Sequence, residues 1–147
     1  MIVTDGQAQL REWLCERIGL VPTRDLVCIG RLGTKGLVGV VGFDQFNGAS
    51  AMMHSAGEGN WLSRDMLYAC FDYPFRVCGV NMVIGLVPSG NTQALRFNKH
   101  IGFKTELVLD GAHPDGSLVL MTMRRGECRY LTRNRPNGQE ISSPASA

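Results

Sequence analysis

The stretch Asn81–Phe103, which reads NMVIGLVPSGNTQALRFNKHIGF, predicts a buried strand, a short break and a helix. The apolar run Met82–Val87 is short and rich in branched side chains, and such a run favours a strand over a helix. Ser89 and Gly90 interrupt the apolar pattern before the helix begins. A buried strand that leads directly into a helix is typical of a domain that mixes the two.

The predicted helix has a clear start and a clear end. Asn91 is a good N-cap, because its side-chain oxygen can accept a hydrogen bond from a backbone N–H one turn further on. Ala94, Phe97 and Ile101 recur at helical spacing and indicate the buried face. Gly102 can take the left-handed conformation that often closes a helix.

Working outward from this stretch, the pattern predicts one domain with a single sheet. Leu37–Phe43 is apolar at successive positions, so we expect a central strand that is covered on both faces. The fold class that we predict is α/β (α+β), with one mixed, mostly antiparallel sheet and helices on both faces. We expect this domain to cover residues 1–131, and residues 132–147 to form a flexible, polar tail. The other expected elements are a helix capped by Thr4 or Asp5 and ended by Gly19, strands at Leu26–Arg31 and Ala49–His54, a loop at Ser55–Asn60, a helix at Trp61–Phe71 that Pro74 interrupts or kinks, and strands at Lys104–Leu109 and Leu118–Met123.

The composition is that of an ordinary globular protein. The 147 residues are 44% hydrophobic and 19% charged, and the net charge of +2 is too low to favour a nucleic-acid partner. No apolar run is long enough to span a bilayer, and the N-terminus lacks a signal-peptide pattern. The five cysteines form no C-x-x-C pair, which indicates reduced, buried thiols. We therefore expect a cytoplasmic protein with no membrane partner and no bound metal.

The glycine-bearing segment after the third predicted strand is the part of the chain suited to an anion. Gly57 and Gly59 allow a sharp turn, and the first free N–H groups of the following helix would point at a phosphate. A pair of glycines alone equally fits a plain turn between a strand and a helix. The segment lacks the third glycine of a dinucleotide fingerprint and the Gly-Lys-Ser/Thr of a P-loop.

Taken together, these segments resemble the GNAT family of N-acetyltransferases. The sequence His54-Ser55-Ala56-Gly57-Glu58-Gly59 fits the family's loop pattern, Gln/Arg-x-x-Gly-x-Gly/Ala, except that a histidine stands first. The Asn91 helix with its closing Gly102-Phe103 matches the family's cofactor-binding half. The runs Trp61-Leu62-Ser63-Arg64 and MTMRRGECRYL (121–131) are similar to the ribosomal-protein-acetyltransferase branch and to short phage members. The resemblance covers about residues 26–131, and is sharpest in 54–64 and 81–131.

The resemblance implies that acetyl-CoA is the cosubstrate and binds where two parallel strands splay apart, Ala49–His54 and Met82–Val87. It implies direct attack by an amine within a ternary complex, and it allows a homodimer. Arg64 would add a positive charge near a phosphate, and Asn91 and Phe97 would contact the cofactor. The backbone N–H groups that would hold the pyrophosphate belong to Gly57, Glu58, Gly59, Asn60, Trp61 and Leu62.

Acetyl transfer needs a neutral amine, and three side chains are candidate bases. His54 ends a predicted strand beside the glycine loop, and imidazole changes charge near neutral pH, although a purely structural histidine fits equally. Asp44 and Glu106 are the carboxylate alternatives, and Asp44 can also cap the turn that follows it. Many family members carry a tyrosine general acid at the position where this chain has Asn98.

Two other functions stay open at this stage. A protein of the same fold that binds CoA or a protein without catalysing a reaction would carry the same motifs. A nucleic-acid interaction module would use the arginines near the C-terminal end, although a solvated face is the simpler interpretation. The acceptor amine cannot be identified from the sequence. The arginines of this cluster are Arg124, Arg125, Arg129, Arg133 and Arg135.

Overall fold

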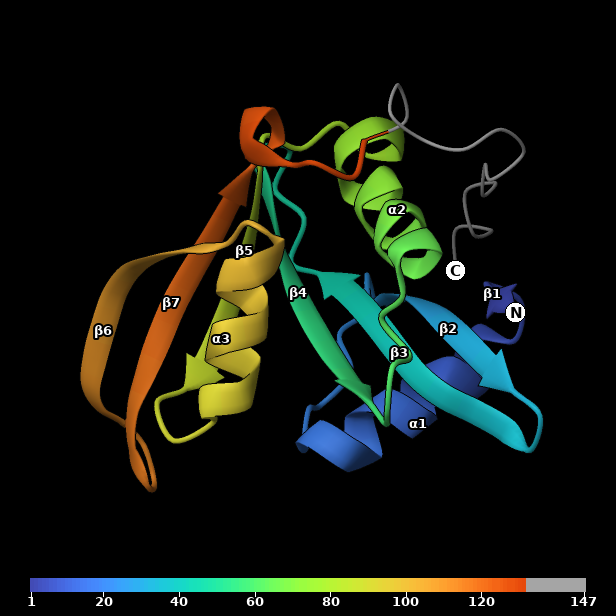
Figure 1. Ribbon diagram of the computed structural model, residues 1–147, viewed down its shortest axis with the longest axis horizontal. Helices are drawn as coiled ribbons and strands as arrows, with labels where there is room; N and C mark the ends of the chain where they lie inside the picture. Colours follow the sequence, from blue (N-terminus) through green and yellow to red (C-terminus); the bar gives the residue numbers. More distant parts are fainter. Residues whose placement is uncertain (132–147) are drawn as a thin grey trace.

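The computed structural model describes residues 1–131, which form one seven-stranded sheet with three α-helices (Figure 1). The predicted tail, residues 132–147, lies outside the described residues. The elements in chain order are β1 (Ile2–Val3), α1 (Gln7–Ile18), β2 (Val27–Gly33), β3 (Gly36–Asp44), β4 (Ser50–Gly57), α2 (Arg64–Asp72), the π-helix η1 (Tyr73–Val77), β5 (Met82–Pro88), α3 (Thr92–Ile101), β6 (Lys104–His113), β7 (Gly116–Arg124) and the 3-10 helix η2 (Arg125–Glu127).

The sheet is antiparallel everywhere except at its centre. Its strands lie in the order β1-β2-β3-β4-β5-β7-β6, and only β4 and β5 are parallel neighbours. These two strands pair only over residues 50–52 and 82–84. Beyond that point β4 continues to Gly57 and β5 to Pro88, and Figure 1 shows them moving apart. The predicted mixed sheet with splayed central parallel strands is confirmed.

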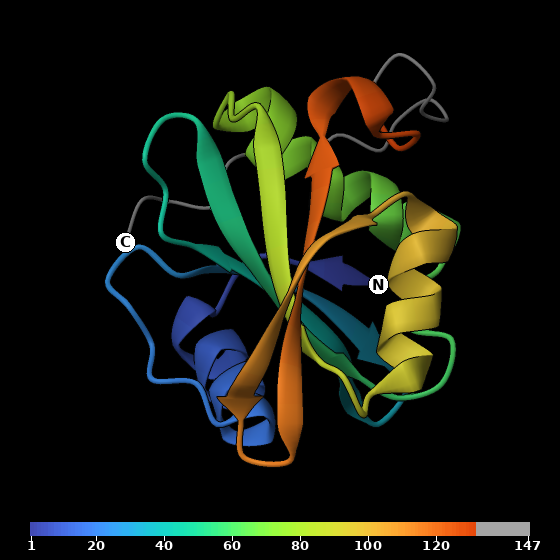
Figure 2. The same cartoon turned by 90° about the vertical axis from the view of Figure 1, so that its left-hand side faces the viewer.

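Helices cover both faces of the sheet, as predicted. Figure 2 shows α1 and α3 on opposite sides of the strands, and α2 packs on the same side as α3. Val40 belongs to the core under α1 and Val41 to the core under α2, so successive β3 side chains enter opposite cores. β3 is therefore the central, doubly covered strand that its apolar sequence indicates.

Two glycines let α1 lie close to the sheet. A Cβ atom added at Gly30 would come within 2.7 Å of Leu10, and one added at Gly42 would come within 2.7 Å of Leu14. Both leucines are almost completely buried. The absence of a side chain at these two strand positions therefore decides how near the helix can approach.

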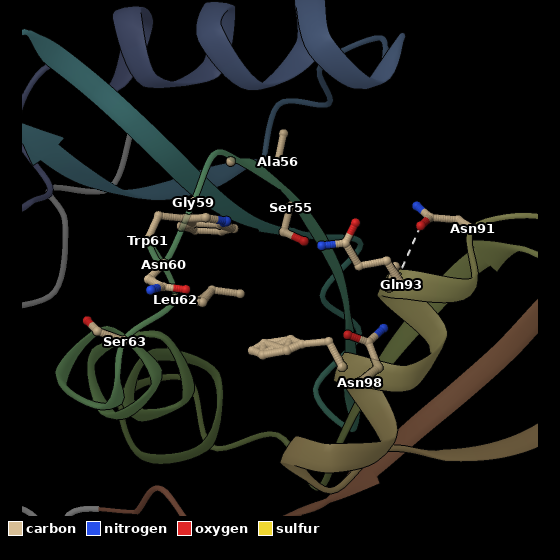
Figure 3. Close-up of a pocket in the computed structure, with 13 residues that line it drawn as sticks. Ser55, Ala56, Gly59, Asn60, Trp61, Leu62, Ser63, Asn91, Gln93 and Asn98 are labelled. Carbon is tan, nitrogen blue, oxygen red and sulfur yellow. Dashed lines mark hydrogen bonds between the residues drawn. The ribbon is translucent and has the colours of Figure 1, made fainter.

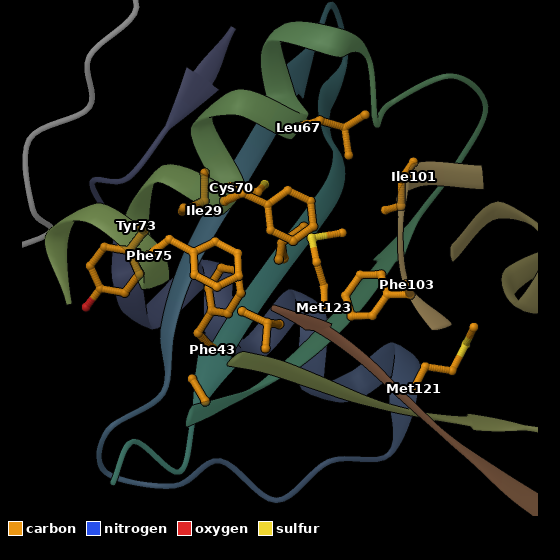
Figure 4. Close-up of a cluster of buried hydrophobic side chains, with 14 of the residues drawn as sticks. Ile29, Phe43, Leu67, Cys70, Tyr73, Phe75, Ile101, Phe103, Met121 and Met123 are labelled. Carbon is orange, nitrogen blue, oxygen red and sulfur yellow. The ribbon is translucent and has the colours of Figure 1, made fainter. Parts of the chain in front are cut away.

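The core under α2 and α3 combines aliphatic side chains with a group of aromatic rings (Figure 4). Phe71 of α2 is fully buried, and its ring centroid lies 6.2 Å from that of Phe75, 6.1 Å from Phe103 and 6.0 Å from Tyr130. Burying a phenylalanine contributes roughly 1.5–3 kcal/mol. These contacts join α2, η1, the end of α3 and the segment after η2, so they hold the helices beside the splayed strands.

The strand, break and helix predicted between residues 81 and 103 are confirmed as β5 and α3. The Asn91 side chain accepts a hydrogen bond from the Ala94 N–H at 3.2 Å, as expected of an N-cap. Gly102 has a φ of 120° and donates to the carbonyls of Asn98 and Lys99. Both ends of α3 are therefore fixed by residues that the sequence singles out.

The predicted start of the first helix is wrong. α1 begins at Gln7, after a left-handed Gly6, and neither Thr4 nor Asp5 caps it. The Gln7 side chain explains the shift, because its amide bonds to the Thr4 carbonyl at 2.7 Å and to the Cys28 backbone at 2.8 and 2.9 Å. These bonds tie the start of α1 to β2.

The predicted loop and second helix are also displaced. β4 continues through Gly57, so the connection begins at Glu58, and α2 starts at Arg64 instead of Trp61. Ser63 is extended at the cap position, with φ of −67° and ψ of 169°. The α-helix ends before Pro74, as expected, but the chain continues in the wider turn of η1 instead of stopping.

Candidate active site

The splay between β4 and β5 opens into two adjoining cavities. The larger, about 680 Å³, lies between residues 59–63 and α3, and is called the loop cavity below. The smaller, about 470 Å³, is lined by the end of α1, by β4 and by β5, and is called the α1 cavity. The two cavities meet along β4 and α3. The residues that line both are Ser55, Asn91, Ala94 and Asn98.

Seven of the nine predicted cofactor-binding residues line the loop cavity. Figure 3 shows the side chains of Trp61 and Leu62 on one wall, and those of Gln93 and Asn98 extending from α3 on the other. Ser55 of β4 lies between the two walls. The seven residues are Gly57, Gly59, Asn60, Trp61, Leu62, Asn91 and Phe97.

The loop wall presents unused backbone donors. Among the described residues, the N–H groups of 59–62 donate to no other group of the protein, whereas the Glu58 N–H donates to the Val38 carbonyl at 2.9 Å. Gly59 has a φ of 62°, and a Cβ atom added there would meet nothing within 4 Å. A run of free amides around an open glycine is the arrangement that binds an anion.

The packing of the Trp61 indole determines the backbone path of this loop. A Cβ atom added at Gly39 would lie 2.0 Å from the indole, and one added at Gly57 would lie 2.1 Å from it. The ring therefore lies flat against two neighbouring strands, which only glycine permits at both positions. Gly57, predicted as a glycine that approaches a ligand, serves here to seat a side chain of the protein.

Arg31 holds the far end of the same loop. Its Nη1 lies 2.8 Å from Ser63 Oγ and 3.0 Å from Asp65 Oδ2. The Ser63 hydroxyl also donates to the Asp65 carboxylate. The Ser63 hydrogen bond, together with Arg31, holds the pKa of Asp65 below its ordinary value. β2 therefore anchors the residues that lead from the loop into α2.

The strand wall between the cavities also has free backbone donors. N–H groups along a strand point alternately to its two sides, and the Glu58 N–H points to β3. The N–H groups of Ser55 and Gly57 therefore point toward the splay, where β4 is no longer paired with β5. On the opposite wall Asn98 uses one amide N–H for a contact of 3.8 Å with the Met121 sulfur.

His54 and Asp44, predicted as alternative bases, form one pair. His54 lines the α1 cavity, and its Nε2 lies 2.8 Å from Asp44 Oδ1. Asp44 is completely buried, and its Oδ2 lies 2.9 Å from Thr23 Oγ1. Because the buried carboxylate accepts, we assign the proton to Nε2, which leaves Nδ1 of the neutral ring as the acceptor.

The remaining predicted residues lie outside both cavities. Glu106 is on the edge strand β6, where it accepts from Thr122 at 2.8 Å. Glu58 is exposed and lines neither cavity. Arg64 stacks over Tyr68 at 5.9 Å and borders a separate hollow beside Arg129.

The arginine cluster is partly used within the protein. Arg125 donates to the Val80 carbonyl at 2.7 Å, and Arg129 donates to the His100 carbonyl. Arg133 and Arg135 lie outside the described residues. The described arginines therefore serve at least in part to fix the segment that follows β7.

Sequence reasoning did not select several residues of the two cavities. Ser55 and Ala56 were treated as loop residues, although β4 carries them into the splay. Asn98 was noted only as a missing tyrosine. Extending the predicted strand to Gly57 would have identified Ser55 and Ala56, because β4 is paired with β3 up to that residue. The other residues missed in the loop cavity are Ser63, Gln93 and Ala94, and apart from His54 and Asn91 none of the α1 cavity residues was predicted as a site residue.

The thiols show no sign of activation. Burial raises the pKa of Cys28 to about 12 and that of Cys128 to about 11, and it also raises the pKa of Cys70. Such groups stay protonated at neutral pH and are poor nucleophiles. Within residues 1–131, no three His, Cys, Asp or Glu side chains are grouped to hold a metal, and no helix is long and apolar enough to cross a membrane.

Comparison with solved structures identifies the fold. A point variant of the spermidine N-acetyltransferase SpeG from Vibrio cholerae superposes with a TM-score of 0.71 at 14% identity, over 92% of this chain and 98% of that one. The same enzyme in complex with CoA and spermine gives a TM-score of 0.63 at 16% identity, over 84% and 76% of the two chains. A chimera of SpeG and hSSAT gives 0.71 at 13% identity, over 86% and 96%. No family model and no curated protein sequence matches the chain. The chain therefore has the GNAT fold that its motifs predicted.

Proposed function

We propose that this protein is an N-acetyltransferase that moves an acetyl group from acetyl-CoA to an amine. One observation carries the proposal: the splay joins a cavity walled by free backbone amides to a cavity that holds an imidazole oriented by a buried carboxylate. The first arrangement suits a diphosphate, and the second suits removal of a proton from an amine. The likeness in fold to enzymes that acetylate spermidine supports the same reaction class.

The loop cavity has the groups that CoA requires. The amides of residues 59–62 would hold the pyrophosphate, and the apolar surfaces of Leu62 and Phe97 would flank the pantetheine arm. The Ser55 N–H would donate to the thioester carbonyl at the junction of the cavities. When bound, acetyl-CoA supplies an acyl group that is already activated as a thioester.

His54 would act at the other side of the junction. Its Nδ1 takes a proton from the ammonium form of the acceptor, directly or through a water molecule, while Asp44 holds the ring and balances the charge. The amine nitrogen then forms a bond to the acetyl carbon, and the carbon–sulfur bond breaks. The nitrogen loses its second proton to solvent, and the thiolate takes up a proton. Asn98 cannot supply that proton, so we assign it to solvent or to His54 in its protonated form.

The proposal is tested by titrating acetyl-CoA and measuring thiol release with a panel of amines. Gly59→Asp should lower the affinity for acetyl-CoA by at least about 100-fold, because it places a carboxylate and a strained φ at the anion site. Gly79→Asp is the matched control, since Gly79 has a φ of 73° and equally open surroundings but lines neither cavity.

Each outcome of this experiment separates one function from another. Binding of acetyl-CoA with thiol release in the presence of an amine supports the transferase. Tight binding without release for every amine tested favours the non-catalytic CoA-binding protein. Equal affinity of wild type and Gly59→Asp would contradict the assignment of the loop to the pyrophosphate.

A further inference from the structure

Among residues 1–131, no Asp, Glu, Lys or Arg side chain lines the α1 cavity. Its walls are made of apolar residues, glycines, a serine, two asparagines and two histidines. The two histidines are His54 and His113. A ligand that enters this cavity therefore meets imidazole and hydrocarbon, without any carboxylate on the cavity surface to pair with an additional ammonium group.

The buried carboxylate behind His54 offers no compensation. Asp44 is fully buried behind His54, and both of its oxygens are already engaged, one by His54 and one by Thr23. A cation in the cavity could not reach it without breaking this pair. An extra positive charge there would lose hydration free energy, and no ion pair would compensate for that loss.

The apolar wall continues beyond the cavity onto an exposed face of the sheet. Leu86 and Leu118 line the cavity. Leu86 is paired with Leu120, which is paired in turn with Leu107, so these side chains share one face. Leu86 is 42% exposed and Leu107 is 53% exposed. The mouth of the cavity thus opens along a row of leucines.

We infer that the acceptor is a small primary amine with an uncharged, apolar body, and that polyamines are poor acceptors. This inference rests on the proposed function and names its substrate class. The amino group reaches His54, and the apolar body lies against Leu86 and Leu118. This acceptor class differs from the one in the names of the structural neighbours, which are spermidine N-acetyltransferases.

A matched pair of probes tests the inference. Hexylamine and 1,6-diaminohexane have the same chain, and differ by one ammonium group. We expect hexylamine to bind the CoA-loaded protein at least about tenfold more tightly by calorimetry, and to have the higher kcat/KM if acetyl transfer occurs. Equal or tighter binding of the diamine overturns the inference, as does binding of neither amine.

Two exposed leucines provide the variants. Leu86→Asp places a carboxylate at the cavity and should move the preference toward the diamine by at least about tenfold, whereas Leu86→Asn, which adds polarity without charge, should not. Leu107→Asp is the control, because Leu107 is exposed on the same face but does not line the cavity. An equal change with Leu86→Asp and Leu107→Asp would contradict the assigned position of the acceptor.

The binding measurements keep the two proposals separable. Thiol release with the diamine in preference to hexylamine supports the transferase and rejects the inferred acceptor class. Selective binding of hexylamine without thiol release supports the acceptor class and rejects catalysis. Acetylation of protein amino groups with neither probe bound rejects the inferred acceptor class and leaves the transferase in place.

Discussion

At the scale of single residues, the proposed chemistry centres on His54. The residue pairs with a carboxylate that no solvent reaches, and it lines the α1 cavity, which meets the loop cavity at Ser55 and Asn98. The pair combines two residues that the sequence indicates as alternative bases. Asp44 and His54 lie ten positions apart on the β3–β4 hairpin, and only the register of that hairpin brings their side chains together.

His54→Ala should lower kcat by about 10²- to 10⁴-fold, the usual contribution of a positioned base. The affinity for acetyl-CoA should change little, because His54 does not line the loop cavity. The effect should therefore appear in kcat and not in the dissociation constant of acetyl-CoA, which steady-state kinetics and calorimetric titration measure separately.

His100→Ala is the control for that experiment. His100 is an exposed residue of α3 that lines neither the loop cavity nor the α1 cavity. An unchanged kcat in His54→Ala would remove the residue from the mechanism and leave it a structural partner of Asp44.

At the scale of elements, the connection between β4 and α2 depends on contacts distant in sequence. Trp61 is the first residue of the predicted helix, and its position is decided by Gly39 on β3. Arg31 on β2 holds the end of the same connection through Ser63. A local helix pattern contains neither contact, and for this reason the predicted helix begins three residues too early.

Gly39→Ala tests whether the indole positions the loop amides. The new Cβ would lie 2.0 Å from the ring, so Trp61 must move, and the overpacking should cost about 1–3 kcal/mol. We expect a shift in tryptophan fluorescence and a loss of acetyl-CoA affinity of about tenfold. Calorimetric titration measures the affinity for acetyl-CoA.

Gly126→Ala is the matched substitution, since a Cβ atom at Gly126 would meet nothing within 4 Å. It should leave both the fluorescence and the affinity close to those of the wild type. If Gly39→Ala binds acetyl-CoA as tightly as this control does, the indole does not set the binding conformation of the loop.

At the scale of the whole molecule, the prediction succeeded where local signals were strong. Asn91 and Gly102 determine the two ends of α3, and the apolar sequence of β3 indicates a strand covered on both faces. Each of these signals lies within a few residues of chain. The position of Glu106 could not be predicted in this way. Strand order places β6 at the edge of the sheet, and no local pattern specifies strand order.

The stability of the folded chain should depend on Asp65 in a defined pH range. Its pKa is lowered by the Ser63 hydrogen bond and by Arg31, so its contribution is present above the ordinary aspartate pKa of about 3.9 and is lost as pH falls. The free energy of unfolding of Asp65→Asn should therefore be lower than that of the wild type at pH 7, and the difference should shrink below pH of about 4.

Denaturant unfolding at several pH values measures this difference. Asp5→Asn serves as the control, because Asp5 is exposed and forms no hydrogen bond or ion pair among residues 1–131. A difference for Asp65→Asn that stays constant from pH 7 to pH 3 would mean that the ion pair with Arg31 adds nothing to stability.

The brief parallel pairing of β4 and β5 has a mechanical consequence. Among the described residues, the backbone pairing of the two halves covers residues 50–52 and 82–84, with one more bond from the Asn81 N–H to the Ala49 carbonyl, so the halves are joined at one end and separate at the other. A ligand bound in that opening would contact both halves at once and link them. The occupied molecule should accordingly be the stiffer one, and more resistant to heat than the empty one.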